Sequence, residues 1–168
     1  MNKKGFTLIE LLIVIGIIAI LAAIIYVAVD PARRLAEARN AERWSSVNGI
    51  LNAVLKYTVD NGGILPATAT AIDSVTTTVQ IIGENTGATA CASVTCGSED
   101  VATTDCYVTG LDTDLVDDYL SAIPYDPSTG DADDTQYYIN KSTNGRITVG
   151  ACAPETVGGD TPTISVSR

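Results

Sequence analysis

An apolar run from Phe6 to Val29 dominates the pattern of hydrophobic and polar positions. Only Thr7, Glu10 and Gly16 interrupt it. At 1.5 Å per residue, a helix of this length spans about 36 Å, and a bilayer core is roughly 30 Å thick. A cleavable secretory signal has a shorter apolar stretch of about 7–15 residues. The run therefore predicts a membrane-spanning helix rather than an ordinary signal peptide.

After Pro31 the pattern stays helical but becomes amphipathic, and it ends at the turn-forming residues Asn61-Gly62-Gly63. At the junction of the two patterns, Asp30-Pro31 permits two interpretations. Pro31 can distort one long helix of about 80 Å, or Asp30 and Pro31 can cap a fresh helix. Apolar spacings of three and four residues predict one buried face, formed by Trp44, Val47, Leu51, Val54 and Thr58, with Leu35, Ile50 and Leu55 beside it.

In the remainder of the chain the hydrophobic patterns are short and alternate between strand-like and helix-like, as in a small α+β domain. Residues 67–110 are rich in Thr, Ala and Gly and have weak periodicity, and the tail from Pro154 has a composition that we expect to be loose. We predict an antiparallel β-sheet packed on the long helix. Its elements are strands at Ser74–Ile82 and Cys106–Thr109, a helix at Leu111–Ser121 capped by Asp112 or Thr113, and a hairpin of Gln136–Asn140 and Arg146–Ala151.

Charge is distributed unevenly along the chain. The net charge is −10, and residues 57–168 hold three basic and sixteen acidic residues. This balance argues against nucleic acid as a general partner. The chain has no histidine, the commonest general base, and no phosphate-binding glycine loop, so we expect no enzymatic activity. Four arginines of the second helical segment either face solvent or face the acidic heads of neighbouring copies: Arg33, Arg34, Arg39 and Arg43.

Glu10 is the acidic residue within the apolar run, where a carboxylate costs a few kcal/mol on insertion scales. It can reach the membrane interface, or it can meet a cation at the same depth. If the chain were cut after Gly5, Phe6 would carry a free amine one helical turn before Glu10. Between staggered copies, Glu10 of one chain could pair with the Phe6 amine of the next and so fix their register.

Residues 3–12, KKGFTLIELL, resemble the processing site of the type IV pilin-like family, which includes pilins and the pseudopilins of type II secretion. The resemblance implies the pilin fold and cleavage between Gly5 and Phe6 by a prepilin peptidase. It also implies N-methylation of Phe6 and assembly into a helical filament with the apolar helices at its centre. By position, Glu10 matches the glutamate at the fifth position of the mature family members.

The resemblance also implies a division of the chain. Residues 1–5 form a leader, 6–29 a transmembrane and filament-core helix, 30–60 the amphipathic half of the helix, and 61–168 a globular head with a loose C-terminal tail. The N-terminus lies in the cytoplasm while the chain is in the inner membrane, and assembly carries the head to the cell surface.

The implied partners are further copies of the chain, the prepilin peptidase and methyltransferase, and the assembly platform with its ATPase. No specific nucleic acid is expected, although DNA uptake is compatible with such a filament. Two alternatives to a pilus subunit stay open: the major pseudopilin of a type II secretion system, and a membrane-anchored surface binding module that does not polymerise.

Four cysteines, Cys91, Cys96, Cys106 and Cys152, all fall in the head, which the implied topology places outside the cytoplasm. Their even number there favours disulfides over a zinc site, since only a C-x4-C pair is closely spaced. Three connectivities are possible. Of the three connectivities, we predict the one with the pairs Cys91–Cys96 and Cys106–Cys152. The family's common C-terminal disulfide loop favours disulfides but does not fix these pairs.

An acidic stretch at residues 123–134 is the candidate for a cofactor site, because calcium prefers six to eight oxygen ligands. Its position before the hairpin is similar to that of the calcium loop of major pseudopilins. The candidate ligands are Asp126, Asp131, Asp133 and Asp134. A solvated turn is the alternative, and we expect no other cofactor.

Overall fold

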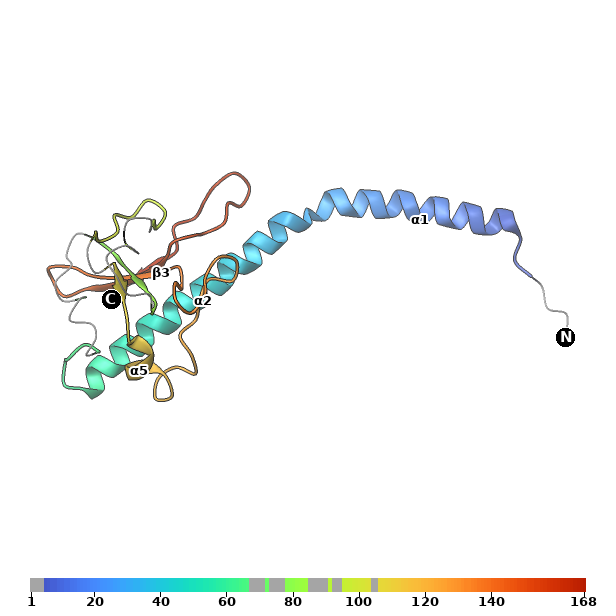
Figure 1. Cartoon of the computed structure of the whole chain (residues 1–168). Helices are drawn as coiled ribbons and strands as arrows, with labels where there is room; N and C mark the ends of the chain where they lie inside the picture. Colours follow the sequence, from blue (N-terminus) through green and yellow to red (C-terminus); the bar gives the residue numbers. More distant parts are fainter. Residues whose placement is uncertain (1–4, 67–71, 73–77, 85–90, 92–94, 104–105) are drawn as a thin grey trace.

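The computed structural model describes residues 5–66, 72, 78–84, 91, 95–103 and 106–168. Figure 1 shows a long bent helical arm that runs into a small head. The arm consists of α1 (Leu8–Val29) and α2 (Pro31–Asp60). α1 extends away from the head, whereas the strands and the short helix α5 (Leu111–Leu115) gather around the second half of α2.

The bend between α1 and α2 lies at Asp30, which adopts the left-handed conformation with φ 43°. Its side chain accepts a hydrogen bond from the backbone N–H of Arg33, and Pro31 occupies the first position of α2. Proline has no N–H to continue the hydrogen bonds of α1, but it suits the first turn of a new helix. Of the two interpretations of this junction, the structure confirms the fresh helix.

The head is built on a five-stranded sheet in the order β2-β1-β3-β4-β5, so the α+β class is confirmed. The sheet is mixed, and the prediction of a purely antiparallel sheet was wrong. β1 and β2 pair in parallel, with Ile81 opposite Tyr107, and the other pairs are antiparallel. Parallel neighbours need a long crossover, which the chain between Ile82 and Tyr107 provides. The strands are β1 (Gln80–Ile82), β2 (Tyr107–Val108), β3 (Tyr137–Lys141), β4 (Ile147–Ala151) and β5 (Ser165–Ser167).

The predicted hairpin is confirmed as β3 and β4, whereas two other predictions for the head were wrong. α5 ends at Leu115 instead of Ser121, because the following turn places Asp117 in the left-handed conformation with φ 75°. Its N-cap is Gly110, with no side-chain cap, rather than Asp112 or Thr113. Of the predicted strand Ser74–Ile82, residues 74–77 lie outside the described residues.

The C-terminal tail is anchored, so the prediction of a loose tail was wrong. β5 pairs with β4, and Val166 lies opposite Val149. Ile164, directly before β5, is 1% exposed and belongs to the hydrophobic core. One buried side chain and a ladder of backbone hydrogen bonds therefore hold a segment whose Ser- and Thr-rich composition predicted none of this.

The core lies between one face of α2 and the sheet. Val47, Ile50, Leu51 and Val54 are buried on α2 as predicted, and they pack against residues of the sheet and α5. Trp44 and Leu35 lie outside this face and are 41% and 57% exposed, so the predicted face was too wide. The sheet and α5 residues of this core are Ile82, Val108, Leu111, Leu115, Tyr137, Ile139, Ile147, Val149 and Ala151.

Candidate functional site: the apolar helix and its start

α1 presents an uncovered apolar surface. No residue of Leu8–Val29 is buried, and its large side chains are exposed, those of Ile9, Ile20 and Ile24 by more than 60%. Among the described residues, one helical region is long and apolar enough to cross a membrane, and it begins at Leu8. Contiguous exposed apolar surface of this extent indicates contact with a membrane or with other protein chains.

A capping box fixes the start of α1. The Thr7 hydroxyl accepts a hydrogen bond from the Glu10 backbone N–H. In return, Glu10 Oε2 accepts from the Thr7 backbone N–H at 2.8 Å and from the Thr7 hydroxyl at 2.7 Å. This reciprocal pair satisfies backbone donors that a helix start leaves unpaired. The Glu10 carboxylate is therefore held toward the N-terminal end of the helix.

Gly5 and Phe6 precede the helix in non-helical conformation, and Phe6 is 83% exposed. The peptide bond between them is thus accessible to a protease. The basic leader residues 1–4 lie outside the described residues. We did not predict the role of Thr7, although the Thr-x-x-Glu spacing before an apolar run is a sequence signature of a capping box.

The structure assigns Asp126 a role other than a calcium ligand. Asp126 is 1% exposed, and its carboxylate accepts from Arg43 Nε at 2.6 Å and from Arg43 Nη2 at 3.0 Å. Burial by itself would raise the pKa of Asp126, but hydrogen bonds from Arg43, Ser128 and Thr129 outweigh it and lower the pKa to about 2. A carboxylate committed to this buried ion pair has no free oxygen to offer a metal.

The other predicted calcium ligands are also engaged or dispersed. Asp131 accepts from the backbone N–H groups of Asp133 and Asp134, and Asp134 accepts from the Tyr107 hydroxyl at 3.0 Å. Within the described ranges, no three acidic, cysteine or histidine side chains converge as a metal would require. In this arrangement the predicted calcium ligands do not form a group that could hold a metal ion, and a calcium site in this stretch stays a prediction.

Two of the four α2 arginines pair within their own head. Arg39 donates to the Glu155 carboxylate, and the wholly buried Arg43 lies between Asp126 and Glu155. The hydrogen bond from Arg39 lowers the pKa of Glu155 to about 2, against the effect of partial burial, and Arg43 adds to the lowering. Arg33 and Arg34 instead share Glu37, and both remain largely exposed.

The cysteines form two disulfides, Cys91–Cys106 and Cys96–Cys152. The predicted pairs Cys91–Cys96 and Cys106–Cys152 were wrong. Cys152 follows β4, and the 96–99 turn lies beside it, so the tertiary structure places Cys96 within bonding distance. The second disulfide fastens the middle of the 91–106 loop to the end of β4.

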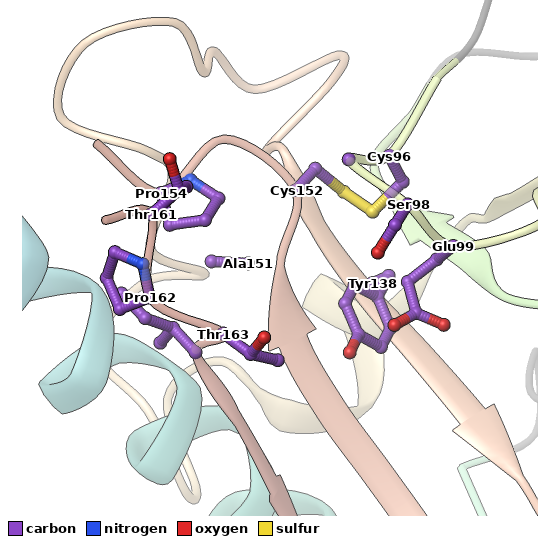
Figure 2. Close-up of a pocket in the computed structure, with 12 residues that line it drawn as sticks. Cys96, Ser98, Glu99, Tyr138, Ala151, Cys152, Pro154, Thr161, Pro162 and Thr163 are labelled. Atoms are coloured by element: carbon purple, nitrogen blue, oxygen red, sulfur yellow. A yellow bond between two sulfur atoms is a disulfide. The ribbon is translucent and has the colours of Figure 1, made fainter. Parts of the chain in front are cut away.

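A cavity of about 410 Å³ lies beside the Cys96–Cys152 disulfide. Figure 2 shows the Tyr138 ring below the disulfide and Glu99 next to it, with Pro154 and Pro162 on the opposite side. The lining residues are Cys96, Gly97, Ser98, Glu99, Tyr138, Ala151, Cys152, Pro154, Thr161, Pro162, Thr163 and Ile164.

A long bent helix with an apolar, uncovered first half, packed on a small mixed sheet through its second half, defines an α+β pilin-like fold. Residues 1–26 match the family model described as the prokaryotic N-terminal methylation motif. Over these residues the chain carries the hallmark of type IV pilin-like prepilins, a family of structural subunits. No solved structure gives a significant match to the chain.

Proposed function

We propose that the chain is the structural subunit of a type IV pilus filament and that it polymerises through α1. The observation that carries the proposal is the wholly exposed apolar helix α1, which begins at a capping glutamate inside a methylation motif. A helix that packs against nothing in its own head needs a membrane or other copies to cover it.

Processing prepares the start of α1 for assembly. Cleavage between Gly5 and Phe6 frees the Phe6 amine, and the methyltransferase activity then methylates it. In the uncleaved chain, the Glu10 carboxylate accepts from the Thr7 N–H, one residue away from the future amine. Before assembly the new N-terminus faces the cytoplasm, and α1 spans the inner membrane.

Assembly transfers α1 from the bilayer into the filament core. There, Glu10 of one copy pairs with the Phe6 amine of the next, and a shift by one step leaves both charges unpaired in apolar surroundings. The assembly platform and its ATPase drive the transfer, and the heads form the outer surface for adhesion, motility or DNA uptake.

Mass spectrometry of the N-terminal peptide in material sheared from intact cells tests this function. The expected result is an abundant peptide that starts at Phe6 and is one methyl group heavier than the unmodified sequence. The same peptide confined to the cell envelope would indicate the major pseudopilin of a type II secretion system. A start near Ile24 would indicate ordinary secretion and would overturn the filament function.

The pseudopilin alternative draws on the resemblance of residues 123–134 to a calcium loop. In that stretch Asp126 forms an ion pair with Arg43, and the location of the processed peptide distinguishes the two functions. A non-polymerising surface module is the other alternative, and it would have no use for Glu10 within an apolar helix.

A further inference from the structure

The charges of α2 oppose the dipole of the helix. A helix is stabilised by acidic side chains at its N-terminal end and by basic side chains at its C-terminal end. α2 has no acidic residue in its first turn and no basic residue in its last turn. It instead carries Arg33 and Arg34 near its start and ends at Asp60. The capping carboxylate of Asp30 offsets part of the cost at the start, and Lys56, about one turn before Asp60, is the basic residue of α2 nearest to its C-terminal end.

Arg33 and Arg34, together the basic end of α2, share a single carboxylate, that of Glu37, as their ion-pair partner. Arg33 Nε lies 3.0 Å from Glu37 Oε1, and Arg34 Nη1 lies 2.8 Å from Glu37 Oε2. Their side chains remain 52% and 66% exposed. Because two guanidinium groups of five donors each share one carboxylate, the basic end retains donors for a further anionic partner.

Asp60, Asp117 and Asp118, together the acidic end, are the last residue of α2 and the two residues that directly precede Tyr119 in the chain. The Tyr119 hydroxyl donates to Asp60 at 3.1 Å, which brings the residue that follows Asp117 and Asp118 to the end of the helix. All three aspartates are exposed. Lys56, which lies 5.4 Å from the centroid of the Tyr119 ring, is the nearby cation and leaves the acidic end with an excess of negative charge.

The two ends cannot neutralise each other within one chain. They are separated by almost the full length of α2, about 40 Å, whereas salt screens exposed charges beyond about 10 Å at 0.1 M. Two copies with parallel helices, one displaced along the axis by that length, bring the basic end of one against the acidic end of the other. A head-to-tail contact of this kind does not close on itself and generates an open filament.

We propose that the basic end of one copy docks on the acidic end of the next copy along the filament. The proposal rests on the proposed function, because it needs many parallel copies. The contact gives Arg33 and Arg34 carboxylate partners and places cations at the C-terminal end of the neighbour's α2. It thereby relieves an unfavourable charge arrangement at both helix ends, in chains that otherwise repel each other through a net charge of −10.

Charge reversal and its rescue in the full chain, expressed with its assembly machinery, test the contact. The first variant is Arg33→Glu with Arg34→Glu, the second is Asp60→Lys with Asp118→Lys, and the third combines all four changes. Asp117 is left unchanged because its left-handed backbone is strained for lysine. The readout is the amount of chain in the sheared fraction relative to the amount retained by the cells.

We expect each double variant to reduce sheared filaments by at least about tenfold, because like charges then face each other, and the fourfold variant to restore them. Matched controls reverse exposed charges elsewhere on the head, Arg146→Glu on one side and Asp100→Lys with Asp133→Lys on the other, and should assemble as the original chain does.

Three results would overturn the proposal. The first is normal assembly of the Arg33 and Arg34 variant. The second is loss in both double variants without rescue. The third is loss in the arginine variant alone, which would assign Arg33 and Arg34 to a phosphate group at the membrane surface. Failure of the proposed function is distinguishable, because the unaltered chain would then be missing from the sheared fraction.

Discussion

Glu10 is exposed, and in the isolated chain its carboxylate accepts hydrogen bonds from both the backbone and the side chain of Thr7. A capping role alone would explain a glutamate at this position. Pairing with the Phe6 amine of a neighbouring copy would require the negative charge of Glu10. Substitutions at Glu10 and Thr7 can distinguish this pairing from the capping role.

Glu10→Val removes the carboxylate, whereas Thr7→Ala removes only the side-chain half of the capping box. We expect Glu10→Val to lower the sheared filament at least about tenfold, because the Phe6 amine of the neighbouring copy loses its counter-charge in apolar surroundings. Thr7→Ala should cost only about 1 kcal/mol of helix stability and leave filaments abundant. Immunoblots of sheared and cellular fractions measure both, and normal assembly of Glu10→Val would contradict the mechanism.

Arg43 is wholly buried, and it joins α2 to two segments that are distant in sequence, through Asp126 and Glu155. Removing one partner of a buried ion pair leaves the other charge without compensation. We expect Arg43→Met to lower the free energy of unfolding by about 3–5 kcal/mol. Arg43→Met with Asp126→Asn should cost less, since no buried charge is then left unpaired.

Chemical unfolding of the full chain in detergent micelles, followed by Trp44 fluorescence, measures these differences. Arg146→Met, at an exposed position, is the control and should change the free energy by less than about 0.5 kcal/mol. Equal losses in the single and double variants would show that the unpaired charge is not the cause.

Acid should destabilise the head over a defined pH range. The pKa values of Asp126 and Glu155 fall from ordinary values of 3.8 and 4.5 to about 2 on folding. Groups whose pKa is lowered by folding stabilise the protein fully above their unfolded pKa, and this contribution is lost as the pH falls through the folded value. We expect the melting temperature to drop between about pH 4.5 and pH 2, with about 2 kcal/mol lost through Asp126. In Asp126→Asn the drop should be smaller, and an unchanged acid profile in that variant would contradict the assignment.

At the scale of elements, the two disulfides have different tasks. Cys91–Cys106 closes a loop with a sequence separation of 15, whereas Cys96–Cys152 spans 56 and connects that loop to the end of β4. Cys96 lies between Cys91 and Cys106 in the chain. The Cys96–Cys152 disulfide therefore fixes the loop to the sheet, whereas the Cys91–Cys106 disulfide closes the loop on itself.

Removing the disulfides separately should give unequal losses. In the loop-entropy model, Cys96–Cys152 stabilises the head by about 4 kcal/mol and Cys91–Cys106 by about 3 kcal/mol. We therefore expect the Cys96→Ser with Cys152→Ser variant to melt at a lower temperature than the Cys91→Ser with Cys106→Ser variant. Mapping of non-reduced peptides should recover the observed pairs, and a Cys91–Cys96 peptide would contradict the structure.

At the scale of the whole molecule, α1 and the head are joined by the chain at Asp30, while α1 itself buries no residue. The hydrophobic core lies between α2 and the sheet. The free energy that holds the head together therefore does not depend on α1, and a detergent micelle can cover α1 separately.

We expect two separate transitions on heating in detergent. The near-ultraviolet circular dichroism of the head should vanish while a helical far-ultraviolet signal from the 22 residues of α1 persists. The matched control is the same experiment on the Asp30→Asn variant, because asparagine keeps both the left-handed backbone and the side-chain cap at the junction, and it should show the same two transitions. Simultaneous loss of both signals would show that α1 and the head unfold as one unit.

Local sequence was sufficient for features that depend on neighbouring residues. The helix end at Asn61, the β3–β4 hairpin and the buried face around Val47 and Leu51 follow from short-range backbone preferences and helical period, whereas the cap at Asp30 was one of two interpretations that the sequence left open. The capping box at Glu10 also has a local signature in the sequence, the Thr-x-x-Glu spacing before an apolar run.

By itself, the sequence determined an apolar helix of membrane length with a methylation motif at its start, because hydrophobicity and local motifs are written in consecutive residues. Tertiary structure alone decided the disulfide pairs, the parallel pairing of β1 with β2, the burial of Ile164 and the partner of Asp126. These features depend on which distant segments meet, and Arg43 shows why composition cannot reveal this. The sequence predicted that Arg43 faces either solvent or the acidic heads of neighbouring copies, yet two carboxylates brought together by the fold make its burial favourable.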